Sequence, residues 1–233
     1  MADILVADDT RSIRSALSLL LEEDGHTVRL ASDGESALEE YCRKRPDMLL
    51  LDVMMPKKNG YQVLKQIRKD DPALPIIMLS AKGSPTDVAL GLDLGSDDYL
   101  PKPFSSEVLL SRINAMFRRM NVMATEECRS KPKPGFDIAS FHVDENRLVL
   151  TGADGSETPL SLREADLLRI LASNPGKLLD RDVLFNEIWG YGYSGTTRTL
   201  DQFMLVLRKK LGNDGSCIVT VRGAGYRYQK PQA

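Results

Sequence analysis

Five polar residues in the first half of the chain each follow a short apolar segment. They are Asp8, Asp9, Asp52, Ser80 and Lys102. Three carboxylates held close together repel one another, and a hard divalent cation with oxygen ligands, such as Mg²⁺, relieves that repulsion. Asp52 can then attack a phosphoryl group, while Mg²⁺ and Lys102 neutralise the charge and the Ser80 hydroxyl bonds one phosphoryl oxygen. These residue types therefore predict phosphoryl transfer to a protein carboxylate.

The elements that must position these residues are strands and helices that alternate over residues 1–120. Helical repeats of apolar residues separate five runs of strand type, at residues 4–7, 28–30, 48–53, 76–79 and 99–100. Such alternation predicts an α/β domain with a doubly wound parallel sheet. In the flavodoxin-like strand order 2-1-3-4-5, all five polar residues face one pocket beyond the carboxyl ends of the strands.

The pattern of the chain changes after residue 120. Residues 121–135 break the periodicity and end in two prolines and a glycine, which predicts a linker. Residues 136–233 begin with short strands around a turn at 152–155, and a helix then starts with the capping-box spacing of Ser161 and Glu164. Two more helices and a hairpin around a Gly-rich turn follow. We therefore predict domains at 1–120 and 136–233, joined by a linker at 121–135.

Composition excludes several classes of protein. The 233 residues are 42% hydrophobic and 27% charged, a globular balance, and no apolar run approaches the ~18 residues of a membrane span. The first residues lack the features of a secretory signal, so we expect a cytoplasmic protein with no membrane contact. Three cysteines, far apart, cannot form a disulfide framework or a close-spaced zinc site.

The net charge of -2 hides a difference along the chain. Residues 136–189 hold five Lys or Arg and ten Asp or Glu, whereas residues 190–233 hold seven and two. A basic end on an otherwise neutral or acidic chain predicts a local contact with a polyanion such as nucleic acid.

Motifs along nearly the whole chain resemble a known family. VADDT at 6–10, LLLDVMMPKKNGYQVL at 49–64, MLSAKG at 78–83 and GSDDYLPKPFSSEVLLSRI at 95–113 look like a response-regulator receiver domain. LSLREADLLRILASNPGKLLDRDVLFNEIWG, RTLDQFMLVLRKKLG and TVRGAGYRY resemble the winged helix-turn-helix output domain of the OmpR/PhoB family. The resemblance implies a phosphorylation-switched transcription regulator of a two-component system. Such a protein acts stoichiometrically and is no enzyme beyond self-phosphorylation and autodephosphorylation.

Carried over by position, the resemblance assigns the phosphorylation site. It makes Asp52 the phosphoacceptor, and a phosphohistidine on a separate sensor histidine kinase the donor. Asp9, Asp52 and the main-chain carbonyl of Met54 are implied to ligate Mg²⁺, with Asp8 acting mainly through water. Lys102 is the implied phosphate partner.

The resemblance also implies how the signal leaves the site. Ser80 and Tyr99 would form a switch pair, and the peptide bond from Lys102 to Pro103 is expected to be cis. A Ser80 hydroxyl drawn toward the phosphate vacates space that Tyr99 can fill. The face of the fourth helix, fifth strand and fifth helix then changes and promotes a homodimer.

The candidate residues of that dimer face are Asp98, Glu107 and Arg112. The sequence departs from the family here, because Leu90 stands where a basic partner for Glu107 is usual. Exposed ion pairs of this sort contribute ~0 to 1 kcal/mol each, so we expect a differently tuned dimer rather than none.

In the output domain, the resemblance places the recognition helix at residues 197–211. This helix would enter the major groove of double-stranded promoter DNA, and the hairpin wing would reach the backbone or minor groove. RNA polymerase is a further expected partner. The candidate DNA contacts are Thr196, Arg198, Thr199, Arg208, Lys209, Lys210, Thr220 and Arg222.

A second departure concerns the exposed face of that helix. Family members often have polar or basic residues there, whereas this chain has the apolar run Phe203, Met204, Leu205, Val206. Apolar side chains can meet thymine methyl groups, pack into an interdomain contact, or weaken DNA binding.

Two alternatives stay open on the sequence alone. An aspartyl phosphatase of the haloacid dehalogenase type also uses an Asp after a strand with Mg²⁺, but that chemistry requires a second acid where this chain has Met54. A regulator that works by protein contact, or without phosphorylation, is favoured by Leu90 and the apolar recognition helix, and opposed by the complete acidic site.

Overall fold

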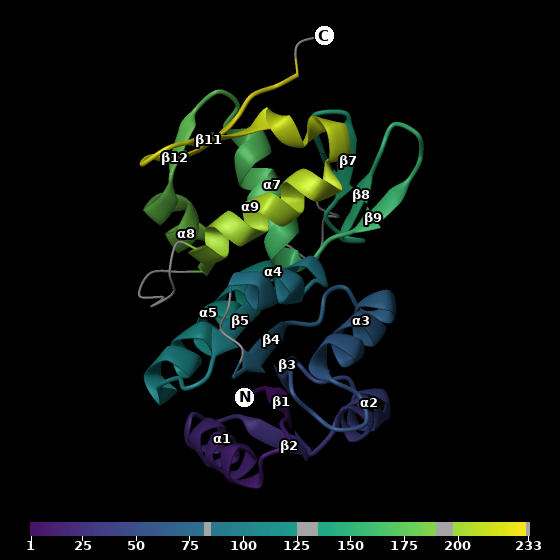
Figure 1. The fold of residues 1–233 in the computed structure, drawn as a ribbon, viewed down its shortest axis with the longest axis vertical. Helices are drawn as coiled ribbons and strands as arrows, with labels where there is room; N and C mark the ends of the chain where they lie inside the picture. Colours follow the sequence, from purple (N-terminus) through teal and green to yellow (C-terminus); the bar gives the residue numbers. More distant parts are fainter. Residues whose placement is uncertain (82–84, 125–134, 190–197, 232–233) are drawn as a thin grey trace. The chain divides into compact units, whose positions relative to one another are not determined.

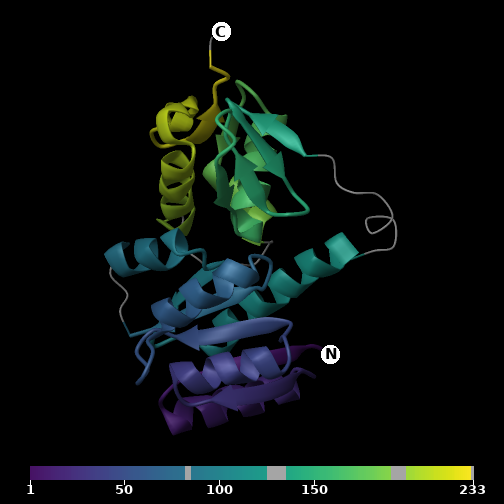
Figure 2. The same ribbon diagram turned by 90° about the vertical axis from the view of Figure 1, so that its right-hand side faces the viewer.

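The computed structural model describes residues 1–81, 85–124, 135–189 and 198–231. Contacts between Cα atoms divide the chain into two compact units, Met1–Leu110 and Ser111–Ala233. The elements of both units are drawn in Figures 1 and 2.

The first unit contains a five-stranded parallel sheet. Its strands are β1 (Asp3–Ala7), β2 (Thr27–Ala31), β3 (Met48–Asp52), β4 (Ile76–Ser80) and β5 (Asp98–Pro101), in the order β2-β1-β3-β4-β5. The predicted flavodoxin-like order is therefore confirmed. Strands β3 and β4 are buried along their whole length, as expected where helices cover both faces of a parallel sheet.

Helices lie on either side of this sheet (Figure 1). They are α1 (Arg11–Glu23), α2 (Gly34–Arg43), α3 (Gly60–Asp70) and α4 (Pro85–Asp93); α5 (Ser106–Ala124) begins in this unit and continues past its end at Leu110. Apolar residues of α2 and α3 pack with alternate residues of the strands, such as Leu49, Leu51 and Met78, to form one core. The predicted cis peptide between Lys102 and Pro103 is confirmed.

Helix α5 reaches beyond the predicted end of the first domain. It continues to Ala124, four residues into the predicted linker, because Met and Ala favour helix and the first proline comes only at residue 132. Residues 125–134 of that linker lie outside the described residues. The domain limits of 1–120 and 136–233 therefore stay a prediction.

The second unit combines two antiparallel sheets with helices (Figure 2). A four-stranded sheet is formed by β6 (Phe136–Ile138), β7 (Phe141–Asp144), β8 (Val149–Thr151) and β9 (Glu157–Pro159) in sequence order. A three-stranded sheet has the order β10-β12-β11, with β10 at Leu178–Asp180, β11 at Ile218–Val221 and β12 at Gly225–Tyr228. The helices are α7 (Leu162–Ser173), α8 (Arg181–Trp189), α9 (Arg198–Lys210) and the 3-10 helix η1 (Gly212–Cys217).

Local sequence explains the starts of these elements. The Ser161 side chain accepts a hydrogen bond from the Glu164 amide, and the Glu164 carboxylate accepts one from the Ser161 amide, so the predicted capping box is confirmed. Strands β11 and β12 form the predicted hairpin, whose turn contains Gly223 with a φ of 72°. Such a positive φ favours glycine over any residue with a Cβ atom.

Candidate functional site

Two buried carboxylates meet one lysine at the carboxyl ends of the first unit's strands. Asp8 follows β1 and Asp52 ends β3, and pairing of Ala7 with Leu51 makes these strand ends neighbours. Asp8 is 0% exposed and Asp52 3% exposed. The Lys102 Nζ atom lies 2.5 Å from Asp8 Oδ2 and 2.6 Å from Asp52 Oδ1. The structure thus brings together three of the residues that the sequence singled out.

Backbone groups fix the remaining oxygen atoms of this pair. The Thr10 amide donates to Asp8 Oδ1 at 2.9 Å, and the Met54 amide donates to Asp52 Oδ2 at 2.8 Å. The Arg14 guanidinium donates to the main-chain carbonyl of Asp8 at 2.6 Å. Each carboxylate therefore has a defined direction, and Arg14 is a supporting residue that the sequence analysis missed.

Asp9 differs from the other two acids. It is exposed, and its Oδ1 accepts a hydrogen bond from the Thr10 hydroxyl at 3.2 Å. Within the part of the chain that the structure describes, no three His, Cys, Asp or Glu side chains are placed to hold a metal ion. The expected convergence of three carboxylates is therefore realised for two, Asp8 and Asp52, with Lys102 between them.

The donor set nevertheless suits a hard divalent cation. Two buried carboxylates and one lysine leave a net negative charge, to which the nearby Asp9 adds. Carboxylate and carbonyl oxygens are the ligands that Mg²⁺ prefers. The residues present therefore fit Mg²⁺.

Burial and pairing set the ionisation of the site in opposite ways. Burial raises the pKa of Asp52, and the charge of Asp8 adds to this, while the hydrogen bond from Lys102 lowers it; the net direction is upward. Burial lowers the pKa of Lys102, but the hydrogen bonds to Asp52 and Asp8 outweigh it and the net direction is again upward. Lys102 therefore stays an ammonium ion at neutral pH and holds the two acids together.

The loop after Asp52 is packed tightly against its neighbours. A Cβ atom on Gly60 would lie 2.2 Å from the Asp52 carbonyl oxygen, so only glycine fits there. Lys57, whose φ is 63°, places its Nζ atom 3.1 Å from the carboxylate of Asp33, the residue that caps α2. These contacts tie the loop to the starts of α2 and α3, where Asp-Gly and Asn-Gly pairs are the sequence signal that could have identified them.

The expected switch pair is buried. Ser80 at the end of β4 is 0% exposed, and Tyr99 on β5 is 3% exposed and belongs to the core of the first unit. The Ser80 carbonyl accepts a hydrogen bond from the Lys102 amide at 2.6 Å. The aromatic ring of Tyr99 is therefore already buried in this structure, and it does not lie on the surface with the space beside Ser80 still to be filled.

The candidate dimer residues are partly buried. Glu107, in the first turn of α5, is exposed, as is Leu90 of α4 at 44%. Asp98 is 0% exposed and its Oδ1 accepts a hydrogen bond from the Tyr99 amide at 2.7 Å, while Arg112 is 6% exposed. Their role at a dimer face stays a prediction.

The apolar run on α9 is not the exposed face that the sequence analysis expected. Phe203, Met204 and Val206 are buried, and Leu205 alone of the four is exposed, at 44%. The period of 3.6 residues turns the others inward, and Phe203 meets the ring of Trp189 edge-on with centroids 5.4 Å apart. That expectation is therefore wrong for three of the four residues.

Three of the candidate DNA contacts are held inside the second unit. Lys210 Nζ lies 2.7 Å from Glu164 Oε1 and donates to the Pro159 carbonyl at 2.8 Å, and Thr199 is 8% exposed. Arg208 donates to the Ile218 carbonyl at 3.0 and 2.6 Å from Nε and Nη2, so it ties α9 to β11.

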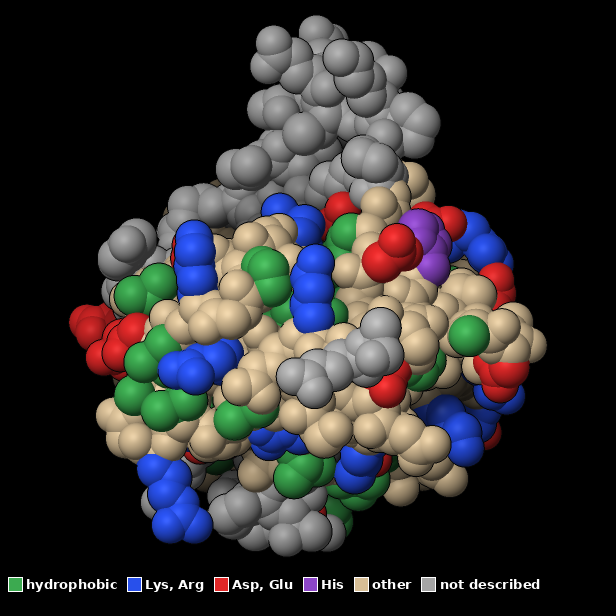
Figure 3. Space-filling model, turned by 90° about the horizontal axis from the view of Figure 1, so that it is seen from above, with side chains coloured by type: hydrophobic (Ala, Val, Ile, Leu, Met, Phe, Trp, Pro, Cys, Tyr) green, Lys and Arg blue, Asp and Glu red, His purple; other side chains and the backbone are tan. Residues whose placement is uncertain are grey.

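The other candidates divide between exposed and undescribed positions. Lys209 on α9, Thr220 on β11 and Arg222 in the hairpin turn are exposed. The Thr220 hydroxyl accepts a hydrogen bond from Arg208 at 2.7 Å. Thr196 and the side chain of Arg198 lie outside the described residues. On the face in Figure 3, Lys and Arg side chains are spread among uncharged and hydrophobic ones rather than gathered in one patch.

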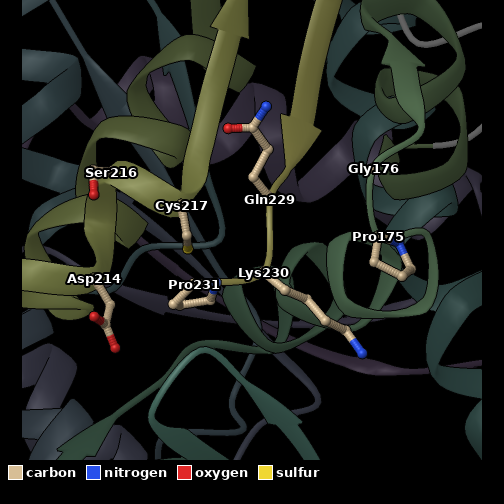
Figure 4. Close-up of a pocket in the computed structure, with 8 residues that line it drawn as sticks. All are labelled: Pro175, Gly176, Asp214, Ser216, Cys217, Gln229, Lys230 and Pro231. Carbon is tan, nitrogen blue, oxygen red and sulfur yellow. The ribbon is translucent and has the colours of Figure 1, made fainter. Parts of the chain in front are cut away.

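A pocket of about 660 Å³ in the second unit offers no comparable chemistry (Figure 4). Its potential nucleophile is Cys217, but burial raises the pKa of this thiol to about 11, so it stays protonated and weakly reactive at neutral pH. Its lining residues are Pro175, Gly176, Asp214, Ser216, Cys217, Gln229, Lys230 and Pro231.

A doubly wound domain with an acidic site, followed by a winged-helix domain, defines a two-domain signalling regulator. The model of the response regulator receiver domain matches residues 4–114, and that of the C terminal of transcriptional regulatory proteins matches residues 155–228. The chain is 40% identical over 225 residues to response regulator MprA of Mycobacterium ulcerans, covering 96% of this chain and 95% of the relative. It is 37% identical over 234 residues to PhoP of Bacillus subtilis, the alkaline phosphatase synthesis transcriptional regulatory protein, covering 98% and 97%.

Solved structures give the same result. A RitR mutant matches with a TM-score of 0.76 and 27% identity, covering 99% of this chain and 100% of that one. DrrB, an OmpR/PhoB homologue of Thermotoga maritima, matches with a TM-score of 0.51 and 27% identity, covering 98% and 99%. The chain belongs to the OmpR/PhoB family of response regulators. It is a phosphorylation-dependent transcription regulator of a two-component system, which confirms the predicted family, fold class and function and disfavours the phosphatase alternative.

Proposed function

We propose that Asp52 accepts the phosphoryl group. An Asp52 carboxylate oxygen attacks the phosphorus of a phosphohistidine, an acyl phosphate forms, the phosphorus–nitrogen bond breaks, and the imidazole leaves with the electron pair. The observation that carries this proposal is the position of the Lys102 ammonium group between Asp8 and Asp52. From there it can pair with the negatively charged oxygens of a phosphoryl group bound to Asp52. The buried Ser80 hydroxyl supplies a hydrogen bond to a phosphoryl oxygen.

The ligands proposed for Mg²⁺ are Asp9, Asp52 and the main-chain carbonyl of Met54, with Asp8 acting through water. Held by these residues, Mg²⁺ would neutralise charge on the transferring phosphoryl group. The chain's own contribution is to hold the carboxylates, through the Thr10 and Met54 amides, and to keep water from most of Asp8 and Asp52.

A groove beside the acidic site supports a protein donor. It has a volume of about 480 Å³ and lies between α1 and the segment that follows β5. A phosphohistidine must come within bonding distance of Asp52, so its protein has to cover the surface next to Lys102. A mostly apolar groove suits an apolar helix of a sensor histidine kinase. Its lining residues are Ile13, Ala16, Leu17, Leu20, Lys102, Pro103, Phe104 and Ser106.

The proposed output is a homodimer on double-stranded promoter DNA that also contacts RNA polymerase. Helix α9 would enter the major groove, with Arg222 at the tip of the wing beside it. Lys209 and Thr220 are exposed on α9 and β11 and remain candidates for phosphate contacts. None of the described helices is long and apolar enough to span a membrane; location in the cytoplasm is proposed.

The proposed chemistry is tested by intact mass after incubation with acetyl phosphate, with and without Mg²⁺. We expect one added phosphoryl group that requires Mg²⁺ and is lost in Asp52→Asn. Asp70→Asn, an exposed acid at the end of α3, is the matched control and should be labelled like the wild type. Equal labelling of Asp52→Asn would place the phosphoryl group elsewhere and defeat the proposal.

A further inference from the structure

Tyr99, the expected switch residue on β5, is enclosed by side chains and backbone from other elements. It is 3% exposed and pairs in register with Met78 of β4, and Tyr61 of α3 packs on the same core. On the α4 side, a Cβ atom at Gly91 would lie 2.9 Å from Tyr99 Cδ2 and 3.2 Å from Cε2. The ring of Tyr99 therefore fills its site, and that site depends on the lack of a side chain at Gly91.

The hydroxyl group of Tyr61 joins Tyr99 to a third element. It lies 3.3 Å from the main-chain carbonyl of Asp87, in the first turn of α4, and shares a hydrogen bond with the Tyr99 side chain. The Asp87 carbonyl accepts from the Tyr61 hydroxyl, which is thus bonded on one side to α4 and on the other to Tyr99. The hydrogen bonds thus run from β5 through α3 to α4. Burial, with the hydrogen bond to Tyr99, raises the pKa of Tyr61, which therefore keeps its proton at neutral pH.

We propose that Tyr61 is a positioning residue of the switch, whose hydroxyl holds Tyr99 in its buried position and links that position to the first turn of α4. The buried position of Tyr99 is then set by two influences, the Tyr61 hydroxyl at all times and the Ser80 site when it is phosphorylated. The inference rests on the proposed function only for its consequence, which is that Tyr61 sets how far phosphorylation can change the α4 and β5 surface.

The position of Tyr99 can be measured without any phosphate. Hydroxyl-radical footprinting of the full chain, read by mass spectrometry of the Tyr99 peptide, reports the fraction of molecules in which this ring is exposed. Tyr61→Phe removes one hydroxyl and should increase the oxidation rate of Tyr99 about five-fold, the factor expected for loss of one hydrogen bond. Unchanged oxidation of Tyr99 would overturn the proposal.

Tyr41→Phe is a matched control. Tyr41 of α2 packs on the same core, and its hydroxyl donates a hydrogen bond to Asp71 Oδ2 at 3.4 Å rather than to Tyr99. This variant should leave oxidation of Tyr99 as in the wild type. An equal rise in Tyr41→Phe would mean that the core has merely loosened, and would also overturn the proposal.

A second variant tests the same site without changing Tyr61. In Gly91→Ala the new methyl group would overlap the Tyr99 ring, so oxidation of Tyr99 should rise although the hydroxyl of Tyr61 is intact. Phosphorylation at Asp52 is measured in parallel, in the wild type and in Tyr61→Phe, to separate this proposal from the proposed function. If the wild type accepts no phosphoryl group, only the proposed function is defeated, because footprinting of Tyr99 requires no phosphorylation.

Discussion

Replacing Lys210 by Met distinguishes an internal ion pair from a DNA contact. The Lys210 ammonium group lies 2.7 and 2.8 Å from the two carboxylate oxygens of Glu164, which is 0% exposed, and donates to the Pro159 carbonyl. Removal of one partner from a buried ion pair costs about 3–5 kcal/mol, because the other charge stays buried. The Lys210 side chain is 16% exposed, so water can partly replace it, and we expect a loss of about 3 kcal/mol. A domain is usually stable by only 5–15 kcal/mol, so this loss is easily measured.

The chain contains its own probe for this measurement. Trp189 is the single tryptophan, 1% exposed in the second unit and stacked on Phe185 with ring centroids 4.8 Å apart. Urea unfolding followed by its fluorescence therefore reports the unfolding of that unit. Lys209→Met, next along α9 and exposed, should change the free energy of unfolding by less than about 0.5 kcal/mol.

A second substitution tests the cause of the loss. Glu164→Gln added to Lys210→Met removes the buried charge but keeps a side chain that can complete the capping box, so most of the lost stability should return. If Lys210→Met instead lowered DNA affinity at unchanged stability, Lys210 would face DNA, and the internal pair would not explain its role.

Three further predictions concern other contacts. Asp3→Asn should lower the free energy of unfolding by about 1–2 kcal/mol at pH 7, measured by circular dichroism. Burial opposes ionisation of Asp3, but Arg29 and a lysine outweigh it and lower the pKa of this carboxyl below its ordinary value of 3.8. The stabilisation is therefore fully present above pH 3.8 and should be lost as the pH falls through the lowered pKa. A cost that persists in acid would point to packing instead. Gly225→Ala should destabilise the second unit by about 1–3 kcal/mol by the same Trp fluorescence, because the Cβ atom would lie 2.0 Å from the Leu179 carbonyl oxygen; wild-type stability would contradict this. Arg208→Lys keeps the charge but cannot make the same two-pronged hydrogen bond to the wing. In anisotropy titrations, the affinity for a selected operator should therefore fall about five-fold, while the dependence of that affinity on salt concentration stays unchanged. Full affinity would show that Arg208 is not a positioning residue.

The fold could be predicted from sequence because its signals are local. The apolar runs ending at Ala7 and Asp52 are short and separated by helical repeats, and this alternation leaves few possible arrangements. Ser161 and Glu164 form a capping-box motif that predicts the start of a helix from only four residues. The strand order followed from the fold class, and with it the meeting of Asp8, Asp52 and Lys102.

Other features could not be predicted because they depend on side-chain directions. Lys210 and Lys209 are adjacent and chemically identical, yet the helical turn points one at Glu164 and leaves the other exposed. Phe203 and Leu205 likewise divide between the core and the surface. A count of charged or apolar residues along α9 does not show these directions, which is why the recognition helix was expected to be more apolar outside than it is.

The three partners in the acidic site are far apart along the chain, and this determines when the site can exist. Lys102 is 94 residues from Asp8 and 50 from Asp52. A ribosome therefore makes both acids well before the only cation that joins them in the described structure. Two carboxylates without a counter-ion resist removal from water, so before Lys102 is added their burial together would require another cation, such as Mg²⁺. The full set of contacts in this site therefore exists only after β5 and the residues that follow it have been added.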